Sequence, residues 1–157
     1  DIIYRKTASL FETASECSAI IANQPPSIQQ ACAQFGKHLG IIFQITDDLL
    51  DYTAKDGSLG KNIGDDINEG KATLPLIYAF EEATTAQRHS LSEALNHGEP
   101  DIQEILDIIN STSSLQRCQE CIQQQAEQAQ IALSPLGHSH DLHQLESLLQ
   151  FAVNRQH

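Results

Sequence analysis

The sequence predicts an all-α protein, a helical bundle without a sheet, and three observations support this fold class. Among 157 residues only eight are Gly and five are Pro, so long stretches lack helix breakers. Those stretches are rich in Ala, Leu, Ile, Gln and Glu, and 40% of the chain is apolar. Apolar residues recur at helical spacing, and no alternating strand pattern stands out. A bundle is the simplest way to bury several such helices.

Each expected helix has a recognisable boundary. The first runs from about Ile2 to Ala22 and is broken by Asn23-Gln24-Pro25-Pro26. A long helix should begin near Ser27, a plausible N-cap, and continue to about Tyr52. Residues 55–70 form a polar loop with four glycines, a length that is usually functional. The remaining helices are expected at about Thr73–Glu82 (with Pro75 in its first turn), Ala86–Asn96, Asp101–Asn110, Ser114–Leu133 and Asp141–Arg155.

Composition excludes several classes of function. The formal net charge is −12, which argues against nucleic acid as a partner. Anionic substrates remain compatible, because bound metal ions can invert the local charge. No run of about 18 apolar residues and no signal peptide is present, so we expect a cytoplasmic protein without a transmembrane segment. The chain opens at Asp1 with a run that already looks helical, so we expect a fragment of a longer protein.

The cysteines and histidines are interpreted as ordinary helix residues. Cys118 and Cys121 form a lone CxxC inside a helical pattern, without the second pair that a zinc site needs. We expect them, with Cys17 and Cys32, to be reduced. A metal site among the histidines near residue 140 is disfavoured, because helical i,i+4 spacing is missing; these are His138, His140 and His143, with Asp141 among them.

The most informative residues are four polar side chains near the end of the long helix. On a helical wheel Asp47, Asp48 and Asp51 fall within about 60° of Gln44. Phe35, Leu39, Ile42 and Leu49 lie opposite, and Ile41, Phe43, Ile45 and Leu50 lie on the flanks. The pattern predicts a buried central helix with one polar face. Gly40, small and on the same arc, is expected to leave room for an apolar substrate chain.

Three acids at the end of a helix are electrostatically unfavourable. Carboxylates about 6 Å apart repel by roughly 3 kcal/mol at an effective dielectric of about 20, and the helix C-terminus adds its own negative potential. A divalent cation would relieve this, and oxygen ligands favour Mg²⁺ or Mn²⁺. A solvated acidic helix end is the alternative. The residue order of an EF-hand is absent.

The loop that follows supplies cations. Lys55, Lys61 and Lys71 lie among glycines, which let the backbone approach an anion closely. Their spacing is not that of a P-loop. The acids Asp65, Asp66 and Glu69 are expected to cap or pair locally rather than bind metal.

Together these blocks resemble the trans-isoprenyl diphosphate synthases, or polyprenyl synthetases. Lys6-Thr7-Ala8-Ser9-Leu10-Phe11 resembles the family's Lys-Thr motif, and residues 40–52 resemble its second aspartate-rich motif, FQxxDDxxD. Leu59-Gly60-Lys61 and Gly70-Lys71-Ala72-Thr73-Leu74-Pro75-Leu76 match its next two blocks. From residue 79 onward the chain matches only as a helical tail. The run LGKNIGDDINEGKATLPL is most similar to bacterial octaprenyl diphosphate synthases of quinone biosynthesis.

The resemblance implies an isoprenoid-synthase-type bundle and a reaction. An allylic diphosphate ionises, isopentenyl diphosphate attacks the carbocation, and loss of a proton leaves a trans double bond. Asp47, Asp48 and Asp51 would bind Mg²⁺, directly or through water. Lys6, Lys61 and Lys71, with Thr7 and Gln44, would bind diphosphate, and carbonyl oxygens at Lys6, Thr7 and Gln44 would stabilise the cation. The resemblance also implies a homodimer.

The resemblance also implies that an N-terminal half is missing. Family members carry a first aspartate-rich motif and isopentenyl diphosphate contacts there, and neither is found in this chain. Residues 1–157 are therefore expected to be the C-terminal part of one polyprenyl synthetase domain, inactive by itself. Two other functions stay open: a class I terpene cyclase, and a non-catalytic helical subunit or dimerisation module of a heteromeric synthase.

Overall fold

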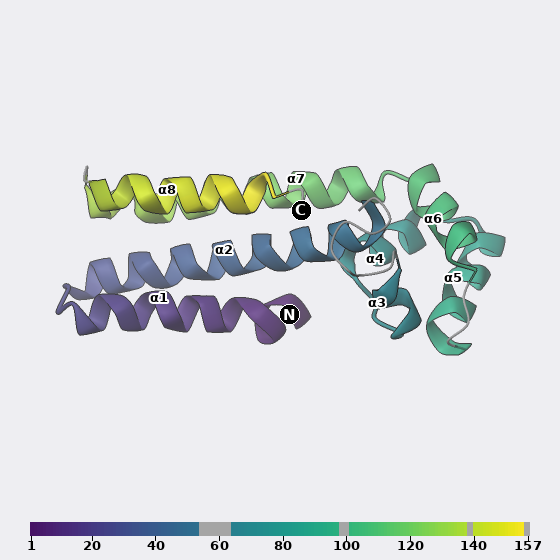
Figure 1. The fold of residues 1–157 in the computed structure, drawn as a ribbon, viewed down its shortest axis with the longest axis horizontal. Coiled ribbons are helices and arrows are strands. Elements are labelled where there is room, and N and C mark those ends of the chain that lie inside the picture. The colour runs from purple at the N-terminus through teal and green to yellow at the C-terminus, as the bar shows by residue number, and fades with distance from the viewer. Residues whose placement is uncertain (54–63, 98–100, 138–139, 156–157) are drawn as a thin grey trace. The chain divides into compact units, whose positions relative to one another are not determined.

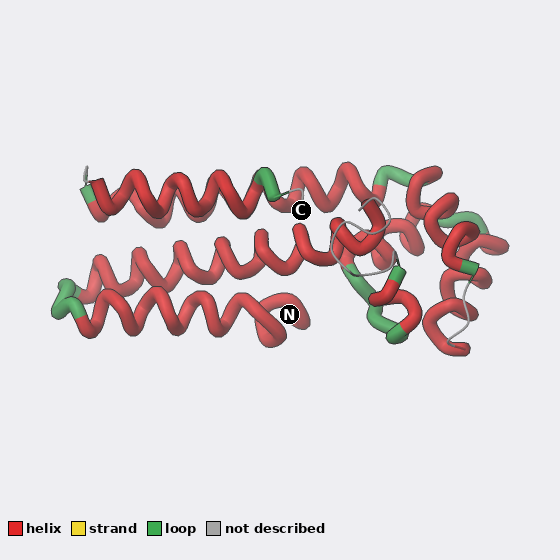
Figure 2. Tube along the Cα trace, viewed as in Figure 1, coloured by secondary structure: helices red, strands yellow, loops and turns green. Residues whose placement is uncertain are grey.

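The computed structural model describes residues 1–53, 64–97, 101–137 and 140–155, and every regular element in them is helical (Figure 2). The predicted all-α fold class is confirmed. The chain divides into two compact units. Unit 1 contains residues 1–46 and 121–155, and unit 2 contains residues 47–120. Two long helices, α2 (Pro26–Thr53) and α7 (Ser114–Leu133), contribute residues to both units.

Unit 1 begins with a helix that contains one turn of π-helix. The element η1 (Tyr4–Ala8) is π-helical and leads into α1 (Ser9–Ile21). α1 and the first part of α2 lie side by side and run in opposite directions (Figure 1). The C-terminal part of α7, the 3-10 turn η2 (Ser134–Leu136) and α8 (His140–Val153) complete this unit.

Two glycines of α2 let α1 approach closely. A Cβ at Gly36 would lie 2.4 Å from the Phe11 carbonyl oxygen, and one at Gly40 would lie 2.6 Å from Ala8 Cα. Both distances are far below van der Waals contact, so only glycine fits. The expectation that Gly40 leaves room for a substrate chain is wrong, because the backbone of η1 occupies that space.

The start of α2 differs by one residue from the sequence prediction. The helix begins at Pro26, and the Pro25 carbonyl accepts hydrogen bonds from the Ile28 and Gln29 amides. Ser27, expected as the N-cap, therefore lies inside the first turn. Pro26 suits the first helical position because its ring presets φ and its missing N–H would have no helical partner there.

Unit 2 is built on a separate apolar core. Its complete helices are α3 (Asp65–Asn68), α4 (Leu74–Glu82), α5 (Thr85–His97) and α6 (Ile102–Ser111). Their core residues include Ile67, Leu91 and Ile109, each fully buried. Pro75 lies in the first turn of α4 as predicted, and the Asp101 side chain caps α6 by accepting from the Glu104 amide at 3.2 Å. α3 was not predicted, since its segment reads as part of the polar loop.

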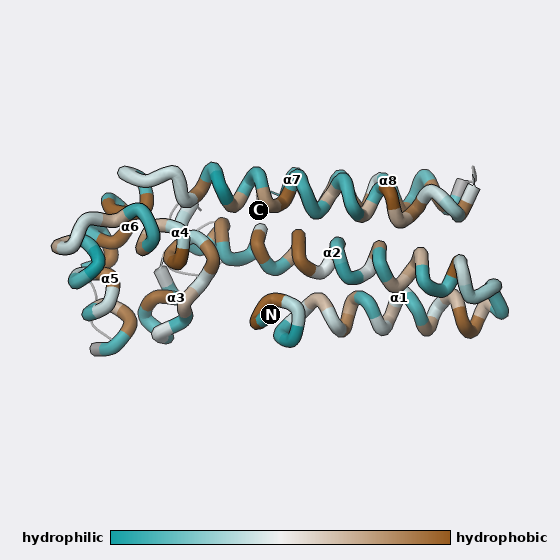
Figure 3. Tube along the Cα trace, turned by 180° about the vertical axis from the view of Figure 1, so that it is seen from behind, coloured by the Kyte–Doolittle hydropathy of each residue, from teal (hydrophilic) through white to brown (hydrophobic). Residues whose placement is uncertain are grey.

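The hydropathy pattern of α2 agrees with a central helix. Figure 3 shows hydrophobic residues recurring along α2 among hydrophilic ones. Ile42, Ile45 and Leu49 are buried, whereas Phe43, expected on an apolar flank, is 37% exposed. Across the described parts of the chain, none of the helices has the length and apolar character needed to span a membrane.

Candidate functional site

Two of the four polar residues predicted near the end of α2 are buried, and the other two are half-buried. Gln44 is 5% exposed and Asp48 is 4% exposed, while Asp47 and Asp51 are half-buried. All four side chains project from one continuous helix at the i, i+3, i+4 and i+7 positions. Asp48 and Gln44 are thus buried polar groups, which proteins retain only with hydrogen-bonding or ionic partners.

Gln44 is tied to the Lys-Thr segment of the first helix. The Thr7 hydroxyl donates to Gln44 Oε1 at 2.6 Å, and both residues belong to unit 1. Thr7 and Lys6 lie in the π-helical turn η1, where the Ser9 amide donates back five residues to the Tyr4 carbonyl. Single π turns are frequent at functional sites, where they shift the hydrogen-bond register of the helix. Lys6 is exposed.

Of the other predicted diphosphate ligands, Lys71 is described and Lys61 lies outside the described residues, as does Lys55. The Lys71 ammonium pairs with Asp66 Oδ1 at 2.9 Å and also with Glu69. Its hydrogen bonds, first to Glu69 and then to Asp66, raise the pKa of Lys71. The side chain keeps 44% of its surface exposed. Asp66 and Glu69 pair locally, as the sequence predicted.

Asp51 makes contacts that the sequence did not predict. Its carbonyl oxygen accepts from the Gly64 amide at 3.1 Å, and its carboxylate Oδ2 accepts from the Asp66 amide at 3.2 Å. Gly64 precedes α3 with φ +83°, a left-handed conformation that favours glycine. The third acid of the motif therefore holds the start of the segment that begins at Gly64.

The next residue of α2 makes a second contact to that segment. The hydroxyl groups of Tyr52 and Thr73 share a hydrogen bond, and the two residues are 6% and 5% exposed. Thr73 precedes α4, but its side chain makes no capping bond to that helix. Burial is the main cause of a raised pKa at Tyr52, and the charge on Asp51 adds to it, although the hydrogen bond to Thr73 opposes both.

Phe43, the residue before Gln44, contacts an aromatic ring and a guanidinium group. These contacts were not predicted from the sequence. The Phe11 and Phe43 ring centroids are 5.4 Å apart, and the Arg155 guanidinium carbon lies 5.0 Å from the Phe43 centroid. Arg155 Nη1 is buried without a hydrogen-bond partner. Since Phe11 lies in α1, Phe43 in α2 and Arg155 just after α8, no local sequence pattern could reveal the contact.

Magnesium fits the donor set at the end of α2. Asp47, Asp48 and Asp51 offer only oxygen ligands, which Mg²⁺ prefers. Among the described residues no three His, Cys, Asp or Glu side chains are grouped closely enough to hold a metal by themselves. Mg²⁺ in phosphate-processing sites is held by one or two carboxylates together with substrate oxygens and water, so a site completed by substrate is compatible with this finding.

The remaining groups considered in the sequence carry no comparable arrangement. None of the four cysteines forms a disulfide, and burial raises the pKa of the Cys32 and Cys121 thiols, which makes them less reactive. His138 lies outside the described residues, as does the side chain of His140. His143 approaches Glu146 at 3.7 Å.

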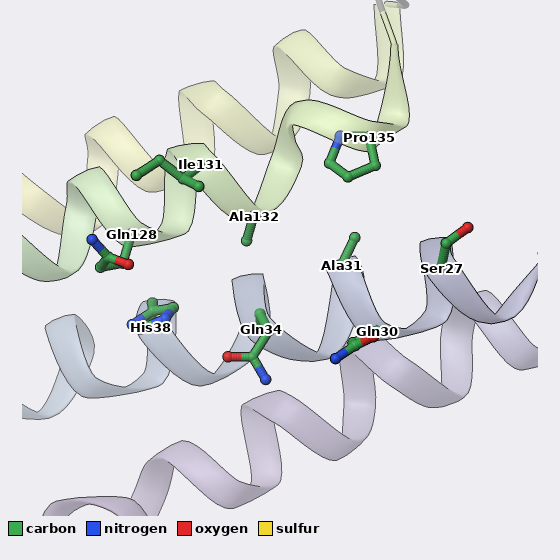
Figure 4. A pocket seen from close by; sticks show the side chains of 9 residues that line it. All are labelled: Ser27, Gln30, Ala31, Gln34, His38, Gln128, Ile131, Ala132 and Pro135. Carbon is green, nitrogen blue, oxygen red and sulfur yellow. The ribbon is translucent and has the colours of Figure 1, made fainter.

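A groove in unit 1 lies between α2 and the end of α7 (Figure 4). Its volume is about 290 Å³. Side-chain amides of Gln30, Gln34 and Gln128 line it, together with His38, whose Nδ1 lies 2.8 Å from Gln125 Oε1. None of the predicted site residues lines this groove.

Comparison with known proteins agrees with the motifs. The Polyprenyl synthetase family model matches residues 1–112. The chain is 38% identical over 156 residues to octaprenyl diphosphate synthase of Escherichia coli strain K12, covering 98% of this chain and 48% of that protein. It is 37% identical over 155 residues to an all-trans-nonaprenyl-diphosphate synthase of Rhodobacter capsulatus, with 98% and 47% covered.

Solved structures agree in fold. A polyprenyl synthase from Caulobacter crescentus CB15, complexed with calcium and isoprenyl diphosphate, has a TM-score of 0.90 at 35% identity, with 99% of this chain and 48% of that chain covered. A decaprenyl diphosphate synthase from Rhodobacter capsulatus has a TM-score of 0.89 at 33% identity, with 99% and 49% covered. The chain thus spans about half the length of these relatives. On the family match and on these similarities, the chain belongs to the polyprenyl synthetase family.

Proposed function

We propose that the protein carrying this chain is a prenyltransferase that condenses isopentenyl diphosphate repeatedly with an allylic diphosphate. The product would be a long all-trans polyprenyl diphosphate, with eight units favoured by the names of the E. coli and Haemophilus influenzae relatives. Residues 1–157 would form the C-terminal part of one polyprenyl synthetase domain. The observation that carries the proposal is the group of acids Asp47, Asp48 and Asp51 at the end of α2, with Asp48 only 4% exposed.

The acids would hold Mg²⁺ against the allylic diphosphate. Asp47 and Asp48 would contribute carboxylate oxygens, with Asp51 acting directly or through water. The metal, when bound, would neutralise charge that develops on the departing diphosphate. The support is chemical: acids crowded on one helix face repel one another, and a divalent cation removes that cost. The Caulobacter structure was complexed with calcium and isoprenyl diphosphate, which also favours a divalent cation.

The remaining residues would bind the diphosphate and stabilise the carbocation. The exposed ammonium of Lys6 and those of Lys61 and Lys71 would neutralise diphosphate oxygens. The Thr7 hydroxyl fixes Gln44 Oε1 by its hydrogen bond of 2.6 Å. Oxygen atoms of Gln44, Thr7 and Lys6 would face the carbocation, where preoriented dipoles lower the barrier without reorganising.

The decisive experiment is an assay of the full-length gene product with both diphosphates and Mg²⁺, followed by analysis of product length. We expect a long-chain all-trans product. Asp47→Ala should lower kcat at least about a hundredfold, because it removes a transition-state interaction. Asp107→Ala is the matched control, since Asp107 is an exposed acid on α6 and should leave turnover unchanged.

The same assay separates the alternatives. A cyclic hydrocarbon product would mean a terpene cyclase, and absence of any product would leave a non-catalytic subunit. Near-wild-type turnover of Asp47→Ala would remove the metal assignment. The proposal extends to a cytoplasmic homodimer whose product serves quinone biosynthesis. The lack of a disulfide among the four cysteines supports the cytoplasmic location, and sedimentation of the full-length protein checks the homodimer.

A further inference from the structure

We propose that Asp51 is a positioning residue, whose carboxylate holds α3 and thereby places the Asp66–Lys71 ion pair at the end of α2. The identity of the anion that Lys71 binds, a diphosphate, rests on the proposed function. The contacts of Asp51 with α3 do not depend on that function. The motif's third acid would thus act through the lysine, besides any contact with metal.

The first step is that Asp51 accepts two hydrogen bonds from the segment that begins at Gly64. The Asp51 carbonyl accepts from the Gly64 amide at 3.1 Å, and its carboxylate accepts from the Asp66 amide at 3.2 Å. The carbonyl contact survives any substitution at this position. The carboxylate contact depends on the side chain, so mutation can test it separately.

The second step is that α3 needs such support. It has four residues, Asp65–Asn68, and a single helical turn is not stable by itself in water. Its one fully buried side chain is Ile67, and Gly64 before it lies against Ile102. The carboxylate of Asp51 additionally satisfies an amide in the first turn, as an N-cap side chain would. Gly64 occupies the N-cap position and has no side chain to do so.

The third step connects α3 to the lysine. The Lys71 ammonium pairs with Asp66 Oδ1 at 2.9 Å, and the Lys71 amide donates to the Asp66 carbonyl at 2.8 Å. The Asp66 side chain is only 17% exposed, whereas that of Lys71 is 44% exposed. The Lys71 ammonium also pairs with Glu69, so the two carboxylates together set its direction while its exposed surface stays open to an anion.

The fourth step is that the same segment is anchored again beyond Lys71. Thr73 bonds through its hydroxyl to Tyr52, and Tyr52 follows Asp51 directly in α2. Residues 64–73 are therefore fixed at both ends to two consecutive residues of one helix turn. This arrangement leaves Lys71 little freedom, which lowers the entropy lost when it binds a ligand.

The two roles of Asp51 require different chemistry. A hydrogen-bond acceptor needs an oxygen atom and no charge, whereas a metal ligand needs the carboxylate. Asp51→Asn keeps an oxygen in the same place, and Asp51→Ala removes it. Asp47→Asn is the control for loss of a metal ligand, because Asp47 is proposed to hold Mg²⁺.

The first readout is amide hydrogen exchange in the full-length protein. We expect Asp51→Ala to speed exchange at Asp66 about tenfold, the size of a lost cap, and Asp51→Asn to change it less than about threefold. Should Asp51→Ala not fold, Asp51→Leu replaces it, having the shape of Asn without an acceptor. Exchange at Asp66 that stays within about twofold of wild type in the folded acceptor-free variant, Asp51→Ala or its replacement Asp51→Leu, would overturn the inference.

The second readout is steady-state kinetics of the same proteins. Asp51→Ala should raise KM for the allylic diphosphate about tenfold, as expected for a lysine that has lost its placement. Asp51→Asn should bring KM back to within about threefold of wild type, even where loss of its charge lowers kcat, whereas Asp47→Asn should lower kcat without the rise in KM. Equal losses in Asp51→Asn and Asp51→Ala, with Asp66 exchange unaltered, would overturn the inference in favour of a purely ionic role. An inactive wild-type protein would count against the proposed function alone, because the exchange experiment does not depend on activity.

Discussion

The Thr7 hydroxyl donates a 2.6 Å hydrogen bond to Gln44 Oε1, joining residues 37 positions apart. One residue lies in the π-helical turn before α1 and the other in α2. Gln44 is 5% exposed, so its amide has few water molecules with which to exchange partners. The bond therefore fixes the direction of the Gln44 carbonyl, the group proposed to face the carbocation.

Removal of this bond should reduce turnover more than binding. Thr7→Val keeps the shape of the side chain but loses the donor, so Gln44 can rotate away from its productive orientation. We expect kcat of the full-length enzyme to fall about tenfold, the value of one net hydrogen bond, with KM little changed. Thr7→Ser retains the hydroxyl and is the control. Equal rates in the valine and serine variants would show that the bond has no role in catalysis.

A second prediction concerns the contact between α1 and α2. In an open helix, Gly→Ala stabilises by about 1 kcal/mol. A Cβ at Gly36 would lie 2.4 Å from both the Phe11 carbonyl oxygen and Ser15 Oγ, so the helices must separate. We expect Gly36→Ala to cost about 1–3 kcal/mol. Thermal unfolding of the full-length protein should therefore show a lower Tm for Gly36→Ala. A raised Tm would mean that the space beside Gly36 is open.

The sequence predicted the helices and the acidic face because both follow from local periodicity. The spacing of Asp47, Asp48 and Asp51 from Gln44 fixes their common face as soon as the segment is helical. α3 was missed for the same reason. The four residues of α3, Asp65–Asn68, are too few to establish a period, and contacts with Asp51 and the core form the helix.

Contacts between distant residues could not be predicted in this way. Gly40 was expected beside a substrate chain because it shares an arc with the acids, yet Ala8 fills that space. Asp51 was assigned from the motif alone, and its bond to the Asp66 amide joins residues 15 positions apart. Periodicity tells which way a side chain faces along its own helix. It does not tell which element packs there.

A third prediction uses the contacts of Glu82. Its carboxylate accepts from the Ser113 hydroxyl at 2.5 Å and from the Ser113 amide at 2.9 Å, just before α7 begins. Arg117 contacts it at 3.2 Å, pairs with Glu81 at 2.8 Å and stacks on the Tyr78 ring. The two bonds from Ser113, and then Arg117, lower the pKa of Glu82 below its ordinary value of 4.5.

The sign of the pH dependence follows from that shift. A carboxylate whose pKa is lower in the folded state stabilises fully above its ordinary value of 4.5 and loses this contribution as the pH falls further. Glu82→Gln cannot ionise, so the difference in Tm between about pH 7 and about pH 3 should become smaller. The control is Glu120→Gln, an exposed glutamate on α7. An unchanged difference in the Glu82 variant would contradict the assignment.

The last prediction concerns alkaline stability and Tyr52. Burial raises the pKa of Tyr52 well above its ordinary value of 10.0. The folded state therefore holds this proton more tightly than the unfolded chain. Its contribution to the free energy of unfolding is complete below pH 10 and is lost as the pH rises beyond it. Tyr52→Phe should accordingly flatten the fall in stability between about pH 9 and about pH 11.

The same variant should be weaker at neutral pH, because it leaves the buried Thr73 hydroxyl without its partner. We expect a loss of about 1–3 kcal/mol at pH 7, measured by denaturant unfolding of the full-length protein across the pH range. Thr73→Val separates the two effects. This variant removes the hydrogen bond but leaves Tyr52 buried. Its free energy of unfolding should be lower at neutral pH and should still fall steeply above about pH 10. A shallow alkaline fall in Thr73→Val would mean that the hydrogen bond, rather than burial, governs the ionisation of Tyr52.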